Sequence, residues 1–287
     1  MSTDPLALMR AAGFPVTQEI GRGMEGVVAA LDDERVVKLW DRRPRPDVER
    51  LRTFYDAVEA SLDRAGASLA VPRILDIGEV DGRVVTVHRR LRGHAVASGA
   101  TDPVLDVLEV LAQVAAHPDL AVLPVPDGEP PFDAGVPFGA SLADLVLRRA
   151  PLLGPRLHHG VADRLAAELR ALEPVAPRLV HGDLGPAHVL LEDGRPVGLL
   201  DFGYLSTVGD PAFDAAVAAA LQDMFGPGAS RATADLDSVV VVRFGYEQQV
   251  LVLYRAAYGL VTASCLAGHP GRHLDWCLAL VDTWLGT

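Results

Sequence analysis

The first ninety residues change between the period of a strand and the period of a helix. Residues 35–40 (RVVKLW) are rich in valine and predict a strand, and residues 73–80 and 83–91 predict two more around a turn at Asp81-Gly82. Residues 19–31 are glycine-rich with strand-like flanks. Between these strands, residues 47–64 predict a helix because apolar side chains recur there at helical spacing, namely Val48, Leu51, Tyr55, Val58 and Leu62. The predicted order is strand, strand, helix, strand, strand.

The pattern becomes mainly helical after residue 93. The predicted helices are 103–116, 142–149, 161–172 and most of 211–287, with loops near 226–229 and 268–271. A proline-rich stretch at 123–137 predicts an irregular connection, and residues 179–203 predict a compact strand–loop–strand unit. We therefore expect an α+β protein with two lobes. A small antiparallel sheet with one helix occupies residues 1–91, and a larger, mainly helical lobe occupies residues 92–287.

Composition and charge narrow the class of protein. Of 287 residues, 49% are hydrophobic, which is enough for a full core, and the formal net charge is −12. A surface this acidic repels nucleic acids and anionic membranes but tolerates a cationic ligand. The N-terminus lacks a signal-peptide pattern, and the longest apolar run, 250–266, is interrupted by Arg255. We expect a cytoplasmic protein, either monomer or homodimer, with neither nucleic acid nor membrane as partner.

The densest chemical signal is the segment 180–203, VHGDLGPAHVLLEDGRPVGLLDFG. It contains Asp183, then His188 five residues later, and Asp201 eighteen residues after Asp183. The Asp193-Gly194 pair between two apolar runs predicts a β-hairpin with positive φ in its turn. Because a hairpin returns the chain to its start, we expect Asp201 to lie beside the loop that carries Asp183 and His188.

Two carboxylates and an imidazole in one place suit phosphoryl transfer. In kinases, an H-x-D-x-x-x-x-N loop supplies a base that accepts the proton of the attacking hydroxyl, and a D-F-G segment supplies a metal ligand. Here the loop runs from His181 to His188, with histidine in the asparagine position, and Asp201 begins the sequence DFG. A divalent cation held there would neutralise charge on the phosphates.

The N-terminal region supplies the matching half of a nucleotide site. Glycines 21, 23 and 26 allow backbone N–H groups to approach phosphates, as in other glycine-rich loops. Lys38 lies in a predicted strand twelve residues after Gly26, and its apolar neighbours favour a half-buried position that needs a partner. This spacing fits a lysine that contacts the α- and β-phosphates. We predict Gly21, Gly23, Gly26 and Lys38 as nucleotide-binding residues.

With these residues the sequence resembles the aminoglycoside phosphotransferase family, which is kinase-like in fold. The resemblance covers about residues 21–216 and is strongest in HGDLGPAHVLL, LLDFG and GDPAFDAA. It implies an ATP- or GTP-dependent enzyme that phosphorylates a hydroxyl group of a small molecule such as an aminoglycoside, a macrolide or a metabolite. It further implies Asp183 as catalytic base, His188 and Asp201 as ligands of Mg²⁺, and Asp214 as a brace for the catalytic loop.

Two positions depart from the family pattern. Histidine at position 188 replaces the usual asparagine, and in this the sequence resembles the macrolide-phosphorylating branch. An imidazole ligand makes Mn²⁺ an alternative to Mg²⁺, because magnesium prefers oxygen ligands. The glutamate that pairs with the nucleotide lysine must come from the helix at 47–64, which offers Glu49 and Glu59. We predict Glu49.

Two other functions fit parts of the pattern. His181, Asp183, His188 and Asp201 together would suit a transition-metal hydrolase, although that leaves the glycine loop and Lys38 without a role. A nucleotide-binding pseudoenzyme that serves as a partner module is the other alternative. For a kinase, the acceptor is expected over the catalytic loop, between helices from 140–172 and 240–285. Tyr246, Tyr254, Tyr258 and Trp276 there either pack in the core or line the acceptor site.

Overall fold

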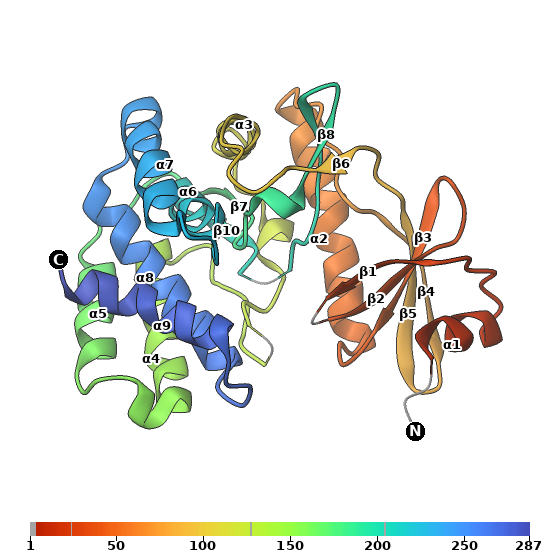
Figure 1. Ribbon diagram of the computed structural model, residues 1–287, viewed down its shortest axis with the longest axis horizontal. Coiled ribbons are helices and arrows are strands. Elements are labelled where there is room, and N and C mark those ends of the chain that lie inside the picture. The colour runs from red at the N-terminus through yellow and green to blue at the C-terminus, as the bar shows by residue number, and fades with distance from the viewer. Residues whose placement is uncertain (1–3, 24, 127, 204) are drawn as a thin grey trace.

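A computed structural model describes residues 4–23, 25–126, 128–203 and 205–287. Its N-terminal part is a five-stranded antiparallel sheet in the order β1-β2-β3-β5-β4, seen at one end of the molecule in Figure 1. The strands are β1 (Glu19–Gly23), β2 (Gly26–Ala30), β3 (Arg35–Trp40), β4 (Ile74–Val80) and β5 (Arg83–Arg89). The expected sheet with one long helix, α2 (Arg45–Arg64), is confirmed.

The two faces of this sheet bury different side chains because successive residues of a strand point to opposite sides. On one face, Val37 and Leu39 pack with Met9 of a short helix, α1 (Pro5–Ala11). On the other face, Lys38 of the same strand lies level with Thr86 of β5, and Val36 lies level with His88. The Trp40 indole N–H donates to the Thr86 hydroxyl at 2.9 Å, which fixes this second face.

Helix α2 lies between the sheet and the rest of the molecule (Figure 1). Its buried residues belong to the same apolar cluster as those of the C-terminal part. Phe54 contacts Phe202 with ring centroids 5.6 Å apart, and Ala70, just after α2, exchanges backbone hydrogen bonds with Val197 and Leu199. The two parts are therefore joined by packing through α2 as well as by the chain at residues 90–93.

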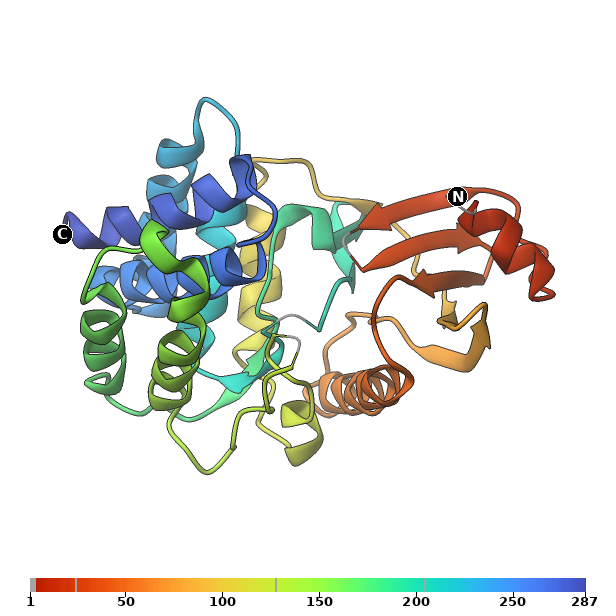
Figure 2. The same ribbon diagram turned by 90° about the horizontal axis from the view of Figure 1, so that it is seen from below.

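The C-terminal part is mainly helical, as expected. Helices α6 (Pro211–Leu221) and α8 (Gln248–Cys265) run through its core, where nearly all their side chains are buried. Around them lie α3 (Asp102–Leu111), α4 (Phe138–Arg149), α5 (Val161–Arg170), α7 (Ala229–Phe244) and α9 (Arg272–Leu285). Figure 2 shows this helical part beside the sheet, with α2 next to it. Among the helices that the structure describes, none combines the length and the apolar character needed to span a bilayer.

The segment 178–209 forms two small strand pairs. Strands β8 (Val189–Glu192) and β9 (Arg195–Leu199) make the predicted hairpin, and its turn has positive φ at both Asp193 (51°) and Gly194 (76°). A two-residue strand, β6 (His94–Ala95), extends this hairpin. Strand β7 (Arg178–Val180) pairs with β10 (Thr207–Gly209) and leads into the predicted catalytic loop.

Three elements differ from the expected ones. Residues 19–31 form two strands, β1 and β2, where the sequence predicts one. The helix expected at 103–116 ends at Leu111, because the chain beyond it turns to pair with β7: Val114 accepts a backbone hydrogen bond from Leu179. Helix α1 is absent from the predicted order, although Asp4 caps its first turn and Pro5 occupies its first position. The proposed boundary between residues 91 and 92 stays a prediction.

Candidate active site

One buried carboxylate anchors the predicted catalytic loop, residues 181–188. Asp214, in the first turn of α6, accepts hydrogen bonds from the backbone N–H groups of His181 (2.7 Å) and Gly182 (2.8 Å). Burial raises the pKa of Asp214 to about 7, and the two N–H donors oppose that shift. Asp210 caps α6 by accepting from the Ala212 N–H. The loop geometry is thereby coupled to the position of a core helix.

His181 is a structural residue of this loop. Its Nε2 donates to the carbonyl of Leu200 at 2.8 Å, and its Nδ1 accepts from the N–H of Asp183. The ring is fully buried, and burial lowers its pKa to about 3, so the imidazole is neutral. Because both ring nitrogens are already used, His181 offers no lone pair to a metal. The alternative hypothesis of a hydrolase with four metal ligands is therefore wrong in including His181 as a ligand.

Asp183 lies where the loop meets α8. The hydroxyl of Tyr258 donates to Asp183 Oδ1 at 2.6 Å. Burial raises the pKa of Asp183, while His188 and the Tyr258 hydroxyl act in the opposite direction. A carboxyl with a raised pKa accepts a proton more readily at neutral pH, which suits a general base.

His188 and Asp201 face each other across the hairpin, as the sequence predicts. The Nδ1 of His188 donates to the backbone carbonyl of Asp183 at 2.8 Å, so Nε2 is the ring nitrogen that faces Asp201. That Nε2 lies 3.5 Å from Asp201 Oδ2. The Asp201 side chain is 68% exposed, and its backbone has φ of +58°, a conformation that is uncommon outside glycine. The strained turn directs a solvated carboxylate towards the imidazole nitrogen.

These two side chains fit a metal that arrives with a nucleotide. The described residues contain no cluster of three or more His, Cys, Asp or Glu side chains able to hold an ion alone. Magnesium in phosphoryl-transfer sites takes one or two protein ligands and fills its shell with phosphate and water oxygens. Asp201 and the Nε2 of His188 would supply two ligands of that kind.

Strand β1 ends and β2 begins on the side of the sheet nearer the C-terminal part in both views (Figures 1 and 2). Gly26 has φ of +148°, and a Cβ placed there would lie 2.0 Å from the carbonyl oxygen of Leu39, so only glycine fits. Gly21 and Gly23 face open space or only a distant neighbour. Their predicted part in nucleotide binding stays a prediction.

Lys38 has a partner different from the predicted one. Its Nζ lies 3.1 Å from Oε2 of Glu25, a residue of the glycine-rich turn. Glu49 is exposed and pairs with Arg45 of its own helix at 2.9 Å, and the other candidate, Glu59, pairs with Arg89. The prediction that Glu49 pairs with Lys38 is wrong. Val48 belongs to the buried face of α2, whereas Glu49, the next residue, is on the exposed side of the helix.

The order of these parts, from glycine turn to DFG, is that of a kinase. The model of the Phosphotransferase enzyme family (APH) matches residues 16–248. The chain belongs to this family. A comparison with curated proteins finds no match.

Several solved structures share the fold of this chain. One is a thermostable mutant of aminoglycoside phosphotransferase APH(4)-Ia in a ternary complex with ADP and hygromycin B (TM-score 0.69, 16% identity, 100% of this chain and 98% of that one). Another is the GDP complex of aminoglycoside 2'-phosphotransferase-IIIa (TM-score 0.61, 17%, 98% and 97%). A choline/ethanolamine kinase family protein from Mesorhizobium loti is also similar (TM-score 0.64, 16%, 98% and 93%).

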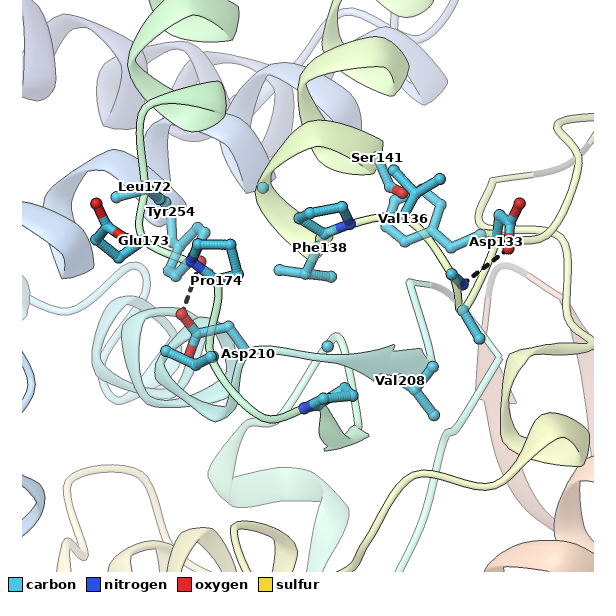
Figure 3. Close-up of a pocket in the computed structure, with 18 residues that line it drawn as sticks. Asp133, Val136, Phe138, Ser141, Leu172, Glu173, Pro174, Val208, Asp210 and Tyr254 are labelled. Carbon is cyan, nitrogen blue, oxygen red and sulfur yellow. Dashed lines mark hydrogen bonds between the residues drawn. The ribbon is translucent and has the colours of Figure 1, made fainter.

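A cavity of about 160 Å³ lies apart from this phosphotransferase site (Figure 3). It is bordered by the end of β10, the start of α4 and the segment after α5, and Phe138, Pro174 and Tyr254 line it. Asp183, His188 and Asp201 are not among its lining residues. Its buried carboxylate, Asp210, is already bound by the Tyr254 hydroxyl at 2.8 Å. This cavity is therefore separate from the place where Asp183, His188 and Asp201 meet.

Two residues of the site, Ser206 and Glu25, are not predicted from the sequence, and Tyr258 is predicted only as a core or acceptor-lining residue, not as the partner of Asp183. Tyr258 lies 75 residues from Asp183, and no local motif links them. Ser206 accepts from the Gly203 N–H and donates to the His181 carbonyl, which connects the DFG turn to the catalytic loop. Glu25 is part of the glycine-rich turn. The sequence offers one indication that Glu25 pairs with a cation of the nucleotide site, since it is the only acidic residue between Glu19 and Asp32.

Proposed function

We propose that this chain transfers the γ-phosphoryl group of ATP or GTP to a hydroxyl group of a small molecule, with Asp183 as the base. The observation that carries the proposal is the convergence of Asp183, His188 and Asp201, since Asp201 of the DFG segment lies beside the braced loop that carries the other two. The acceptor O–H gives its proton to the Asp183 carboxylate while its oxygen bonds to the γ-phosphorus. The bond between that phosphorus and the bridging oxygen breaks, and ADP or GDP leaves.

The other residues bind and orient. Lys38 would contact the phosphates of the nucleotide, and Gly21, Gly23 and Gly26 would let the turn lie close above them. His188 and Asp201 would hold Mg²⁺ or Mn²⁺, which neutralises charge on the phosphates when bound. Tyr258 orients Asp183 through its hydroxyl hydrogen bond.

The acceptor would approach Asp183 from α8 and α9. Tyr258 packs against Trp276 of α9 with ring centroids 6.3 Å apart, so these helices border the base. The net charge of −12 favours an acceptor that carries a cationic amine. Amino sugars and amino alcohols combine a hydroxyl with such an amine, and the structurally similar proteins include one bound to hygromycin B and one of the choline/ethanolamine kinase family.

Substitution of Asp183 tests the proposal. Turnover of ATP and GTP would be measured with hygromycin B, choline, ethanolamine and a macrolide as acceptors, with Mg²⁺ or Mn²⁺. Asp183→Asn should lower kcat by about 10²- to 10⁴-fold and leave nucleotide affinity unchanged, because the amide keeps the shape but accepts no proton. Asp193→Asn, in the exposed hairpin turn, is the matched control. An Asp183→Asn protein as fast as wild type would exclude this base, and nucleotide binding without any transfer would favour the pseudoenzyme.

A further inference from the structure

Two cations and one carboxylate meet between the glycine-rich turn and the DFG segment. Glu25 pairs through Oε2 with Lys38 Nζ at 3.1 Å and through Oε1 with the guanidinium of Arg43. Arg43 is in the short link between β3 and α2. One carboxylate thus bridges two positive side chains, and the cluster retains a net positive charge.

Exposure separates the members of this cluster. The Lys38 and Arg43 side chains are 16% and 11% exposed, whereas that of Glu25 is 42% exposed. Lys38 Nζ lies 3.7 Å from the centroid of the Trp40 ring, and the Arg43 guanidinium carbon lies 5.2 Å from it. The cations are therefore held in place by the indole below them, while their carboxylate partner reaches in from the solvent side.

Arg43 also lies against the catalytic segment. A Cβ placed on Gly203, the glycine of DFG, would be 3.3 Å from Arg43 Nη1. The Arg43 guanidinium therefore lies close both to the Lys38–Glu25 pair and to Gly203, which is two residues after Asp201. In this fold the phosphates of a nucleotide must pass between the lysine and the DFG carboxylate.

We propose that Arg43 is a second phosphate-binding residue and that Glu25 occupies its site until a nucleotide displaces it. This inference rests on the proposed nucleotide-dependent function. No carboxylate of α2 pairs with Lys38 among the described residues, so Glu25 is the carboxylate that the nucleotide phosphates would replace beside Lys38 and Arg43. A guanidinium binds phosphate oxygens through two N–H donors, and a polyphosphate carries more charge than one carboxylate, which favours the exchange.

The test is calorimetric titration of ADP and GDP into wild type, Arg43→Met and Arg42→Met. Arg42 is the matched control because it is the adjacent arginine, is exposed, and pairs with no described residue. Arg43→Met should weaken binding of the nucleotide that wild type prefers by about 10- to 100-fold, and Arg42→Met by less than about 2-fold. Adenosine or guanosine, which has no phosphate, should bind both variants equally well.

A double substitution separates direct phosphate contact from an indirect effect through Glu25. Glu25→Gln should tighten nucleotide binding by about 3- to 10-fold, because a competing carboxylate is removed. Arg43→Met should still weaken binding about tenfold or more in the Glu25→Gln background. If it has no effect there, Arg43 acts only through Glu25 and the proposal is overturned.

The same titrations distinguish a failure of the proposed function from a failure of the role of Arg43 alone. If wild type binds neither ADP nor GDP, the proposed function fails and this inference fails with it. If wild type binds a nucleotide but Arg43→Met equals Arg42→Met, the proposed function stands and only the role of Arg43 is lost. Weaker binding by Glu25→Gln would contradict displacement, because Glu25 would then be a ligand of the bound state.

Discussion

Two ionic groups, one in each part of the molecule, use similar residues in different surroundings. In the C-terminal part, Arg255 of α8 binds Asp237 of α7 through two parallel hydrogen bonds of 2.6 and 2.7 Å, and their side chains are only 7% and 4% exposed. In the N-terminal part, the cations Lys38 and Arg43 are similarly buried, but their carboxylate, Glu25, is 42% exposed.

The exposure of the carboxylate decides what each group can do. Asp237 cannot leave Arg255 without stranding two buried charges, which costs far more than the pair contributes. Glu25 can turn into water, so only its two cations remain in need of an anion. A charge pair buried on both sides therefore fixes a helix, whereas a pair with one solvated partner is available for exchange with a ligand.

The largest expected effect is on the buried pair. Asp237→Asn leaves the Arg255 guanidinium buried without its counter-charge and should lower the free energy of unfolding by about 3–5 kcal/mol. Asp235→Asn is the matched control on the same helix, because Asp235 is 71% exposed and lies 3.5 Å from Arg231; it should change stability by less than about 0.5 kcal/mol. Urea denaturation measures both. Equal losses in the two variants would remove the distinction drawn from burial.

The sequence predicted the catalytic segment better than the nucleotide side, and the reason is the range of the contacts. Asp183, His188 and Asp201 are brought together by one hairpin, whose turn is specified by Asp193 and Gly194. Strands β3, β4 and β5 and helix α2 also follow from local periodicity, whereas residues 19–31 form two strands where the sequence predicts one. Such features depend on neighbours within about twenty residues, which a reading of the sequence can weigh directly.

The partner of Lys38 depends on packing between elements. The apolar stripe of α2 leaves no position for a glutamate on its buried face, because Leu51, Phe54 and Tyr55 occupy that face. Both aromatic rings contact Phe202 of the C-terminal part. The sequence predicts that stripe, and Glu49 is not part of it. The pairing of Glu25 with Lys38 depends instead on the packing of the β1–β2 hairpin against β3. Contacts such as Tyr258 with Asp183, 75 residues apart, have no local signal at all.

His88 is a buried imidazole that has no carboxylate partner among the described residues, and it contrasts with both ionic groups. His88 of β5 is 6% exposed, and its Nε2 lies 2.7 Å from the Thr86 hydroxyl. Burial, with the nearby Lys38, lowers its pKa from 6.5 to about 3. The folded protein keeps this ring neutral while the unfolded chain takes up a proton below pH 6.5, so this contribution to stability is present above pH 6.5 and is lost as the pH falls towards 3.

His88→Gln should remove that part of the pH dependence. Between pH 7 and pH 5, wild type should lose about 2 kcal/mol of unfolding free energy through His88, and the variant should lose correspondingly less. His159→Gln, at an exposed position, should retain the wild-type dependence. Urea denaturation at the two pH values measures the difference. Parallel pH dependences of wild type and His88→Gln would show that this burial does not keep the ring neutral.

Asp183 stands between the two extremes, and Tyr258 gives the smallest of the expected effects. The carboxyl is partly buried, unlike the fully buried Asp237, and its partner is a neutral hydroxyl, which an acceptor hydroxyl would be able to replace. Because the Tyr258 hydroxyl lowers the pKa of Asp183, Tyr258→Phe should raise it, and a base with a higher pKa is protonated over a wider acid range. The acid limb of kcat against pH should therefore move upwards by roughly one unit or less, which corresponds to about 1 kcal/mol, while nucleotide affinity stays unchanged. Tyr254→Phe is the matched control, since its hydroxyl donates to Asp210 instead. It should leave the acid limb in place, so superimposable limbs for Tyr258→Phe and Tyr254→Phe would mean that Tyr258 only packs beside the base.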